Sequence, residues 1–128
     1  MSKDRFAGCR VLVVEDEMLI AMLIEELLQT LGCHVVGPVA TLEKALELAR
    51  SETFDAALLD VTIRGGKVYP VAEALLARGI PFAFASGYRD WALPEALRNH
   101  PRLMKPFNKT QLEEQVASLC NAVNSASR

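Results

Sequence analysis

Residues 11–17 read Val-Leu-Val-Val-Glu-Asp-Glu, a short run of apolar and mostly β-branched side chains that ends in three acids. A continuous apolar run of this length is typical of a strand buried on both faces of a parallel sheet. The same arrangement, an apolar run followed at once by a polar group, occurs three more times in the chain. The polar groups are Asp60 after 56–59, Ser86 after 82–85 and Lys105 after 103–104. The pattern predicts several buried strands that each end in a chemically useful side chain.

The segments between these runs have the periodicity of helices. In residues 17–31, Ile20, Ile24 and Leu27 fall on one face at a spacing of 3.6 residues. The further predicted helices begin after Thr41, span 69–78 and 91–98, and follow a capping box of Asn108 and Gln111. The predicted strands are 10–14, 35–36, 54–59, 80–85 and 103–104. Five strands alternating with five helices predict an α/β fold, a doubly wound, flavodoxin-like parallel sheet of strand order 2-1-3-4-5.

The composition excludes several classes of protein. A chain of 128 residues suits one domain with a real core, and no stretch reads as a linker. The formal charge is −2 and no local basic patch is visible, so we expect no nucleic-acid-binding surface. No segment approaches the length of a membrane span, which favours a cytoplasmic protein with no membrane contact. The cysteines Cys9, Cys33 and Cys120 lie far apart in apolar stretches, which favours reduced thiols over a disulfide or a zinc site.

Three acids are expected to meet at one edge of this sheet. Parallel strands share an edge at their C-terminal ends, and the first and third strands are neighbours, so Glu15, Asp16 and Asp60 should converge. Carboxylates held within a few ångströms repel one another, and Mg²⁺ is a hard dication that takes oxygen ligands. At the same edge, the Lys105 ammonium could pair with a phosphoryl oxygen and the Ser86 hydroxyl could donate to another. The residues predict a magnesium-assisted phosphoryl-transfer site.

Each of these residues alone has an ordinary explanation. The acids 15–17 could be a solvated helix start favoured by the helix dipole. An acid such as Asp60 commonly ends a strand, and a serine such as Ser86 is often a turn former. Their joint occurrence, with Lys105, at the ends of four of the five predicted strands argues for a shared function.

With these residues in place, the chain resembles a known family, the receiver domains of two-component response regulators. The resemblance rests on VLVVEDE, LLDVTIRGG, FASGY and LMKPF and extends over nearly the whole chain. It implies that Asp60 is the phosphoacceptor, which attacks the phosphorus of a kinase phosphohistidine. It also implies that Asp16, Asp60 and the backbone carbonyl of Thr62 hold Mg²⁺, while Glu15 acts through metal-bound water. Two further residues would sense and neutralise the new phosphoryl group, namely Ser86 and Lys105.

Residues 69–90 resemble one subgroup more closely, the "FAT GUY" receivers of alphaproteobacterial signalling, which are often tied to the general stress response. Ser86 stands where that subgroup usually has threonine, which keeps the hydroxyl. Most receivers carry Tyr or Phe three residues before the lysine as a rotating switch, and here that residue is Arg102. Arg64 stands where many receivers have proline. We therefore expect no aromatic switch of the usual kind.

An apolar surface is predicted beside the acids. In the helix predicted over 17–31, Met18 and Met22 lie opposite the buried stripe around Ile20, and Leu19 lies on its flank. Methionines suit adaptable contacts with partners, so we expect this face to dock the kinase, although scattered apolar side chains are also normal on surfaces.

The segment after Ser86 is the expected route by which the signal leaves the site. A hydroxyl drawn toward a phosphoryl group would first pull on residues 87–91, in which Gly87 lets the backbone move. Tyr88 and Trp91 are bulky side chains whose repacking could expose or hide a partner surface. The alternative is that both aromatics only cover the edge of the sheet.

We interpret residues 1–128 as a single-domain response regulator without an output domain, which signals by protein contact. It would accept phosphate from a histidine kinase or a histidine phosphotransfer protein and lose it by its own hydrolysis, acting as an effector, shuttle or sink rather than as an enzyme. Its downstream partner is not identified by the sequence. One alternative is a phosphorylation-independent, receiver-like docking module. Another is a flavin-binding flavodoxin, but the acids at 15–16 would repel the flavin phosphate.

Overall fold

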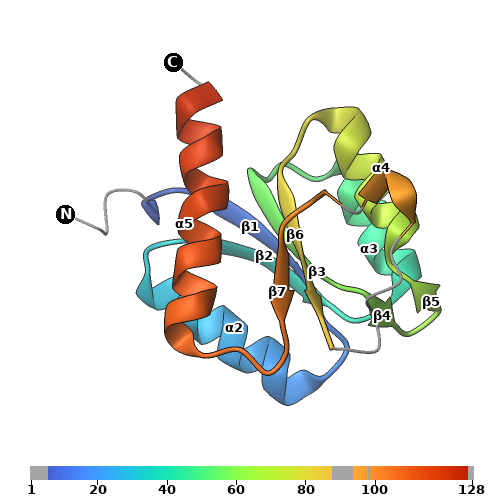
Figure 1. The fold of residues 1–128 in the computed structure, drawn as a ribbon, viewed down its shortest axis with the longest axis horizontal. Coiled ribbons are helices and arrows are strands. Elements are labelled where there is room, and N and C mark those ends of the chain that lie inside the picture. The colour runs from blue at the N-terminus through green and yellow to red at the C-terminus, as the bar shows by residue number, and fades with distance from the viewer. Residues whose placement is uncertain (1–5, 88–93, 98, 127–128) are drawn as a thin grey trace.

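The computed structural model describes residues 6–87, 94–97 and 99–126, with the backbone alone at residues 96 and 121–126. Its centre is a five-stranded sheet in which every pair of neighbouring strands is parallel (Figure 1). The sheet consists, in chain order, of β1 (Arg10–Val14), β2 (His34–Val39), β3 (Ala56–Asp60), β6 (Phe82–Ser86) and β7 (Arg102–Met104). The spatial order is β2-β1-β3-β6-β7, which is 2-1-3-4-5 when the strands of this sheet alone are numbered. The predicted fold class and strand order are confirmed.

Four helices are described, and they cover both faces of the sheet (Figure 1). They are α2 (Met18–Thr30), α3 (Leu42–Ser51), α4 (Tyr69–Arg78) and α5 (Lys109–Ala126). The predicted caps are present. The Thr41 hydroxyl accepts a hydrogen bond from the Lys44 backbone amide at 3.2 Å. Asn108 and Gln111 bond to each other's backbone amides with their side chains, at 2.8 and 2.9 Å.

The core has two layers because successive side chains of a strand point to opposite faces of the sheet. Leu12 and Leu59 pack in the layer under α3 and α4. Val13 and Leu58 pack in the layer with α2 and α5. Every residue of β3 and β6 is buried, which explains why these segments are uninterrupted apolar runs until their last, polar residue.

The structure differs from the prediction at β2, which runs on through Gly37 and Pro38 to Val39 instead of turning there. The ladder continues past the strand, since the Glu15 backbone amide donates to the Val39 carbonyl at 2.9 Å. Gly37 has a φ of +94°, and a Cβ at this residue would lie 3.1 Å from the Val13 carbonyl oxygen. Glycine therefore accommodates an irregularity in the β1–β2 register rather than a turn, and proline is tolerated because β2 is an edge strand.

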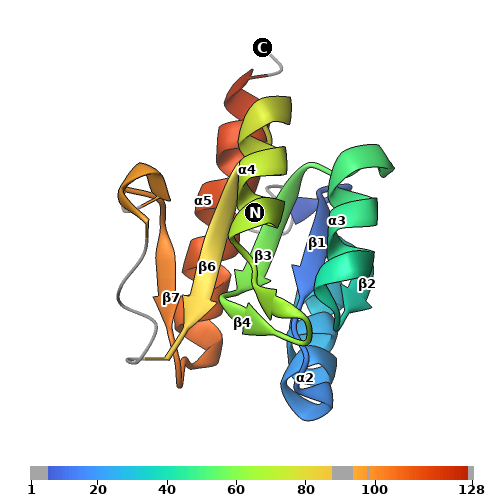
Figure 2. The same cartoon turned by 90° about the vertical axis from the view of Figure 1, so that its right-hand side faces the viewer.

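The loop after β3 is also more regular than predicted. It forms a two-stranded antiparallel hairpin of β4 (Thr62–Ile63) and β5 (Gly66–Lys67), which lies just beyond the end of β3 (Figure 2). The helix predicted over 91–98 lies largely outside the described residues. Within this range, Glu95–Leu97 form a 3-10 turn.

The prediction of three reduced cysteines is wrong for two of them. Cys9, just before β1, forms a disulfide with Cys120 in α5. These residues are 111 positions apart, so their proximity depends on how α5 packs beside the start of β1 and is not visible in the spacing of the sequence. Cys33 is a free, buried thiol whose pKa is raised to about 11 by burial. Among the described residues, no helix is both long and apolar enough to cross a membrane.

Candidate functional site

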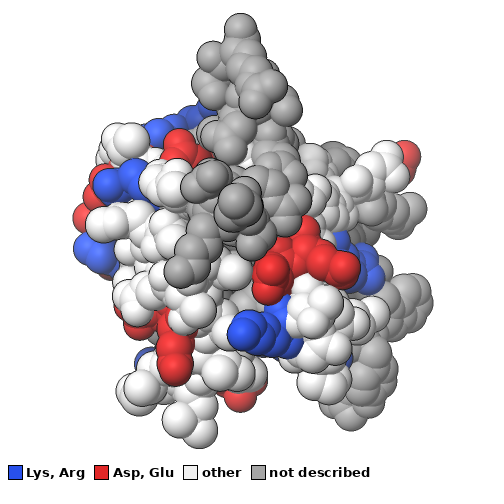
Figure 3. Space-filling model, turned by 90° about the vertical axis from the view of Figure 1, so that its left-hand side faces the viewer, with Lys and Arg blue, Asp and Glu red and all other residues white. Residues whose placement is uncertain are grey.

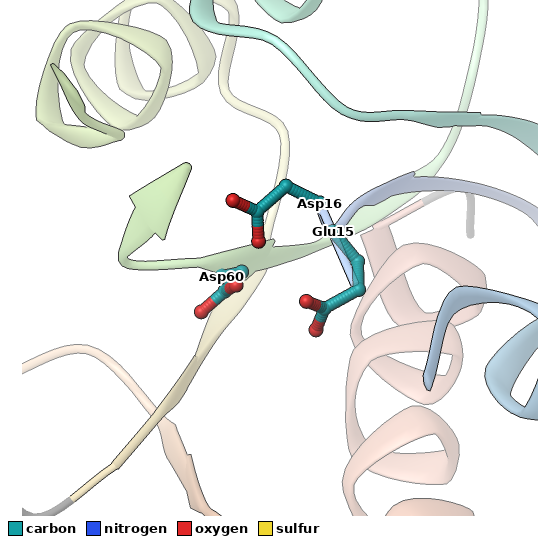
Figure 4. Close-up of side chains that lie close together, drawn as sticks. All are labelled: Glu15, Asp16 and Asp60. Atoms are coloured by element: carbon teal, nitrogen blue, oxygen red, sulfur yellow. The ribbon is translucent and has the colours of Figure 1, made fainter. Parts of the chain in front are cut away.

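The C-terminal ends of β1 and β3 bring the three predicted acids together. Glu15 and Asp16 follow β1 directly, Asp60 is the last residue of β3, and Val14 pairs with Leu59 where the two strands end. One carboxylate oxygen from each acid lies within 4.8 Å of those from the other two. In Figure 4 the three side chains point toward a common region. The grouping results from the parallel register, as the sequence predicted.

Burial makes this cluster electrostatically costly. The exposed fraction is 2% for Glu15 and 6% for Asp60, whereas Asp16 is half-buried. Burial, together with the hydrogen bond and the repulsion from Glu15, raises the pKa of Asp60 from its usual 3.8 to about 8. The site therefore favours either a proton or a bound cation at Asp60 near neutral pH.

Lys105 supplies the one positive group that contacts these acids among the described residues. It follows β7, and its Nζ lies 2.9 Å from Glu15 Oε1 and 3.4 Å from Asp60 Oδ1. Burial alone would lower the pKa of Lys105, but the hydrogen bond to Glu15 and the charge of Asp60 outweigh it and raise this pKa. The other Glu15 oxygen, Oε2, accepts from the Glu17 backbone amide at 3.2 Å. The charged lysine thus lies between the side chains of Glu15 and Asp60.

Ser86 is fully buried at the end of β6, in register with the end of β3. Its Oγ has no hydrogen-bond partner among the described residues. An unpaired buried hydroxyl typically costs about 1–3 kcal/mol, so its presence calls for a specific explanation, such as a catalytic role or a bound ion. The Ser86 backbone carbonyl accepts from the Lys105 amide at 2.8 Å, so β6 and β7 bring this hydroxyl and the lysine to the same edge.

The residues present fit a magnesium ion. Three carboxylates supply the hard oxygen donors that Mg²⁺ prefers, and the cluster carries more acids than the single lysine can neutralise. Thr62, the predicted carbonyl ligand, opens β4 two residues after Asp60. Two backbone hydrogen bonds hold its neighbour Val61 in place. The Val61 amide donates to the Ala85 carbonyl, and the Val61 carbonyl accepts from the Val68 amide.

The apolar face predicted beside the acids is present on α2. The exposed fractions are 76% for Met18, 81% for Leu19 and 57% for Met22. The sequence reasoning missed Leu23, which is 55% exposed and one helical turn after Leu19, a spacing that could have identified it. The predicted switch residues Tyr88 and Trp91 lie outside the described residues.

Charge is mixed on the face drawn in Figure 3, where basic and acidic side chains are interspersed. No broad basic area is seen there among the described residues.

The geometry of acids, lysine and hydroxyl at the carboxyl edge of this sheet defines a class of protein. The chain matches the family model of the response regulator receiver domain over residues 11–117, and it belongs to that family. Receiver domains take phosphate from histidine kinases or phosphotransfer proteins, bind Mg²⁺ at an acidic pocket and serve signalling rather than classical enzymatic roles.

Particular relatives support the assignment. The solution structure of SdrG from Sphingomonas melonis Fr1 is 44% identical, with a TM-score of 0.77, and the match covers 93% of this chain and 98% of that one. The crystal structure of the response regulator PhyR from Brucella abortus is 28% identical, with a TM-score of 0.79, covering 98% of this chain and 53% of that one. The transcriptional regulatory protein PdtaR of Mycobacterium tuberculosis is 31% identical over 107 residues, 80% of this chain. The match spans about half, 52%, of the length of PdtaR.

Proposed function

We propose that this protein accepts a phosphoryl group on Asp60 from a histidine kinase or a histidine phosphotransfer protein. One observation carries the proposal. Asp60 ends β3 in contact with Lys105, and its oxygens lie in the same cluster as those of Glu15 and Asp16. In the transfer, an Asp60 carboxylate oxygen forms a bond to phosphorus while the bond from phosphorus to the donor histidine nitrogen breaks, and the imidazole leaves with that electron pair.

The electrostatics of the site support a requirement for a cation. Asp60 attacks only as the carboxylate, yet its pKa is about 8 in the protein without metal. Mg²⁺ held by Asp16, Asp60 and the Thr62 carbonyl, with Glu15 acting through metal-bound water, would stabilise the ionised acid and the charge of the transferring group. Lys105 is close enough to pair with a phosphoryl oxygen bonded to Asp60. The Ser86 hydroxyl, which has no partner within the described part of the chain, can donate to another phosphoryl oxygen.

The face of Met18, Leu19 and Met22 is the proposed docking surface for the phosphodonor. It lies at the start of α2, two residues after Asp16, so a partner seated on it would reach the acids. Its side chains are apolar and exposed, which suits the helices of a kinase or phosphotransfer protein.

Output would follow from protein contact with a downstream partner, through residues 87–91 after Ser86, including Tyr88 and Trp91. Hydrolysis of the aspartyl phosphate would end the signal, and the same chemistry would serve a phosphate shuttle or sink. A phosphorylation-independent docking module is the second candidate. It explains the exposed face of α2 but gives no reason for the buried acids, the lysine between them and the buried Ser86 hydroxyl.

Intact-mass spectrometry after incubation with acetyl phosphate and Mg²⁺ tests the assignment. The parent protein and a control, Glu47→Gln on the exposed side of α3, should each gain one phosphoryl group. Asp60→Asn should gain none. Equal uptake by Asp60→Asn and the parent would refute the phosphoacceptor, and an undiminished rate after chelation would refute the metal requirement.

A further inference from the structure

The β4–β5 hairpin is joined directly to the phosphoacceptor, since Val61 alone separates Asp60 from Thr62. It pairs only two residues on each side, Thr62 with Lys67 and Ile63 with Gly66. Two-stranded hairpins are marginal in water even when they are much longer. The hairpin therefore depends on contacts with the rest of the protein to hold its shape.

The tip of the hairpin is bound to the start of α3. The Arg64 carbonyl accepts a hydrogen bond from the amide of Leu42, the first residue of α3, at 2.8 Å. Gly65 has a φ of +101°, and a Cβ there would lie 3.2 Å from the Leu42 Cβ. Glycine is needed at this tip both for the backbone angle and for the close approach to α3.

The base of the hairpin is closed by a side-chain bond. Lys67 Nζ donates to Thr62 Oγ1 at 2.8 Å, between two residues directly opposite each other in the antiparallel pair. Below this pair, the Val68 amide donates to the Val61 carbonyl at 2.8 Å. These bonds restrict the backbone of the two residues that follow Asp60.

We propose that the β4–β5 hairpin, bound to α3 at its tip and closed by the Lys67–Thr62 bond at its base, positions the Thr62 backbone for cation binding beside the acids. Lys67 is then a positioning residue of the site and not merely a surface charge. The proposal rests on the proposed function, because it assumes that Mg²⁺ binds at Asp16 and Asp60.

The two roles of Lys67 predict changes of opposite sign. A lysine that acted only through its charge would repel a cation, so Lys67→Met would tighten Mg²⁺ binding. A lysine that holds Thr62 in place would instead weaken binding when it is removed. Thr62→Val removes the same hydrogen bond without changing any charge, so it should weaken binding to a similar extent.

Mg²⁺ titrations of the whole chain, followed by backbone amide NMR, measure these effects as dissociation constants. Lys67→Met and Thr62→Val should each raise the constant by about 1.5- to 5-fold, which corresponds to the ~0.2–1 kcal/mol of a cross-strand pair. Thr62→Ser keeps the hydroxyl and Lys67→Arg keeps a donor, so both variants should have the dissociation constant of the parent. Lys44→Met on exposed α3 is the matched control and should leave it unchanged.

The double variant isolates the pair from whatever else each side chain contacts. The double variant Lys67→Met/Thr62→Val should have a Mg²⁺ dissociation constant no higher than the higher of the two single-variant constants. Tighter or unchanged binding in Lys67→Met, or full additivity in the double variant, would overturn the proposal. Gly65→Ala should also weaken Mg²⁺ binding, because it moves the hairpin tip away from α3. An unaltered Mg²⁺ dissociation constant would refute the contribution of the tip to positioning Thr62.

Asp16→Asn separates this proposal from the one on which it rests. If the parent and Asp16→Asn respond identically to Mg²⁺, the acids are not a cation site and the proposed function fails. If Asp16→Asn loses the response while the hairpin variants match the parent, the cation site stands and the positioning role of the hairpin is refuted.

Discussion

Replacing Asp60 by asparagine should change how the stability of the metal-free protein depends on pH. The pKa of Asp60 rises from 3.8 to about 8 on folding, mainly through burial and then through Glu15. Between these values the folded chain holds a proton that the unfolded chain has released. The stabilisation from this proton is complete below pH 3.8 and is lost as the pH rises through about 8.

The magnitude follows from proton linkage. One proton bound only in the folded state makes the free energy of unfolding fall by about 1.4 kcal/mol per pH unit. From pH 5 to pH 7 the contribution of Asp60 is therefore a loss of about 3 kcal/mol. The asparagine side chain of the variant cannot ionise, so Asp60→Asn should lack this slope. The Lys105 ammonium is charged throughout this range in both states, since its raised pKa lies above 10.5.

Urea unfolding followed by far-UV circular dichroism, in EDTA at pH 5, 6, 7 and 8, measures the effect. Acids that lie away from the cluster contribute equally to the two proteins and cancel in the difference. The free energy of unfolding of Asp60→Asn should therefore rise relative to that of the parent from pH 5 to pH 7. Saturating Mg²⁺ should flatten the slope of the parent, because the cation stabilises the ionised acid. Parallel stability curves for the two proteins in EDTA would refute the raised pKa and the account of the site as a cluster of unneutralised acids.

Three further outcomes are expected. Lys105→Ala should still take up phosphate from acetyl phosphate, but its amide NMR spectrum should change less on phosphorylation than that of the parent, and an equal change would contradict the role of the lysine. Met18→Glu with Met22→Glu should slow transfer from a kinase at least about tenfold and leave uptake from acetyl phosphate unchanged in the mass assay, whereas loss of both would indicate misfolding. The fluorescence of Trp91, the only tryptophan, should change on phosphorylation in the parent and much less in phosphorylated Ser86→Ala, and an equal change in both would exclude the loop as the transmitter.

The fold could be predicted because the buried strands are marked so clearly. β3 and β6 are inside the molecule over their whole length, so their sequences are unbroken apolar runs closed by Asp60 and Ser86. The edge strand β2 is less buried and contains Gly37 and Pro38, and its length was underestimated for that reason. Local sequence signals report burial and turn chemistry, and they are weakest where a strand is half exposed.

Contacts between distant segments were beyond the reach of the sequence. The Cys9–Cys120 disulfide depends on the packing of α5, and the β4–β5 hairpin depends on the bond between Arg64 and Leu42. Neither contact has a local signature, because each joins two segments through their placement in the fold. The acids of the site could be predicted since only the register of parallel strands is needed to bring them together.

Because residue 102 is an arginine and not an aromatic residue, we expect the backbone bond between β6 and β7 to have a larger role in transmitting the signal. Arg102 begins β7 opposite Phe84, and two residues later β7 ends beside Ser86. The Ser86 carbonyl accepts from the Lys105 amide at 2.8 Å, so the buried hydroxyl and the lysine belong to backbone segments that are directly bonded. A phosphoryl group on Asp60 that engaged both side chains would act on the ends of β6 and β7 together. The signal would then reach both ends of the segment that connects β6 to β7 at once. No rotating aromatic side chain on β7 would be needed.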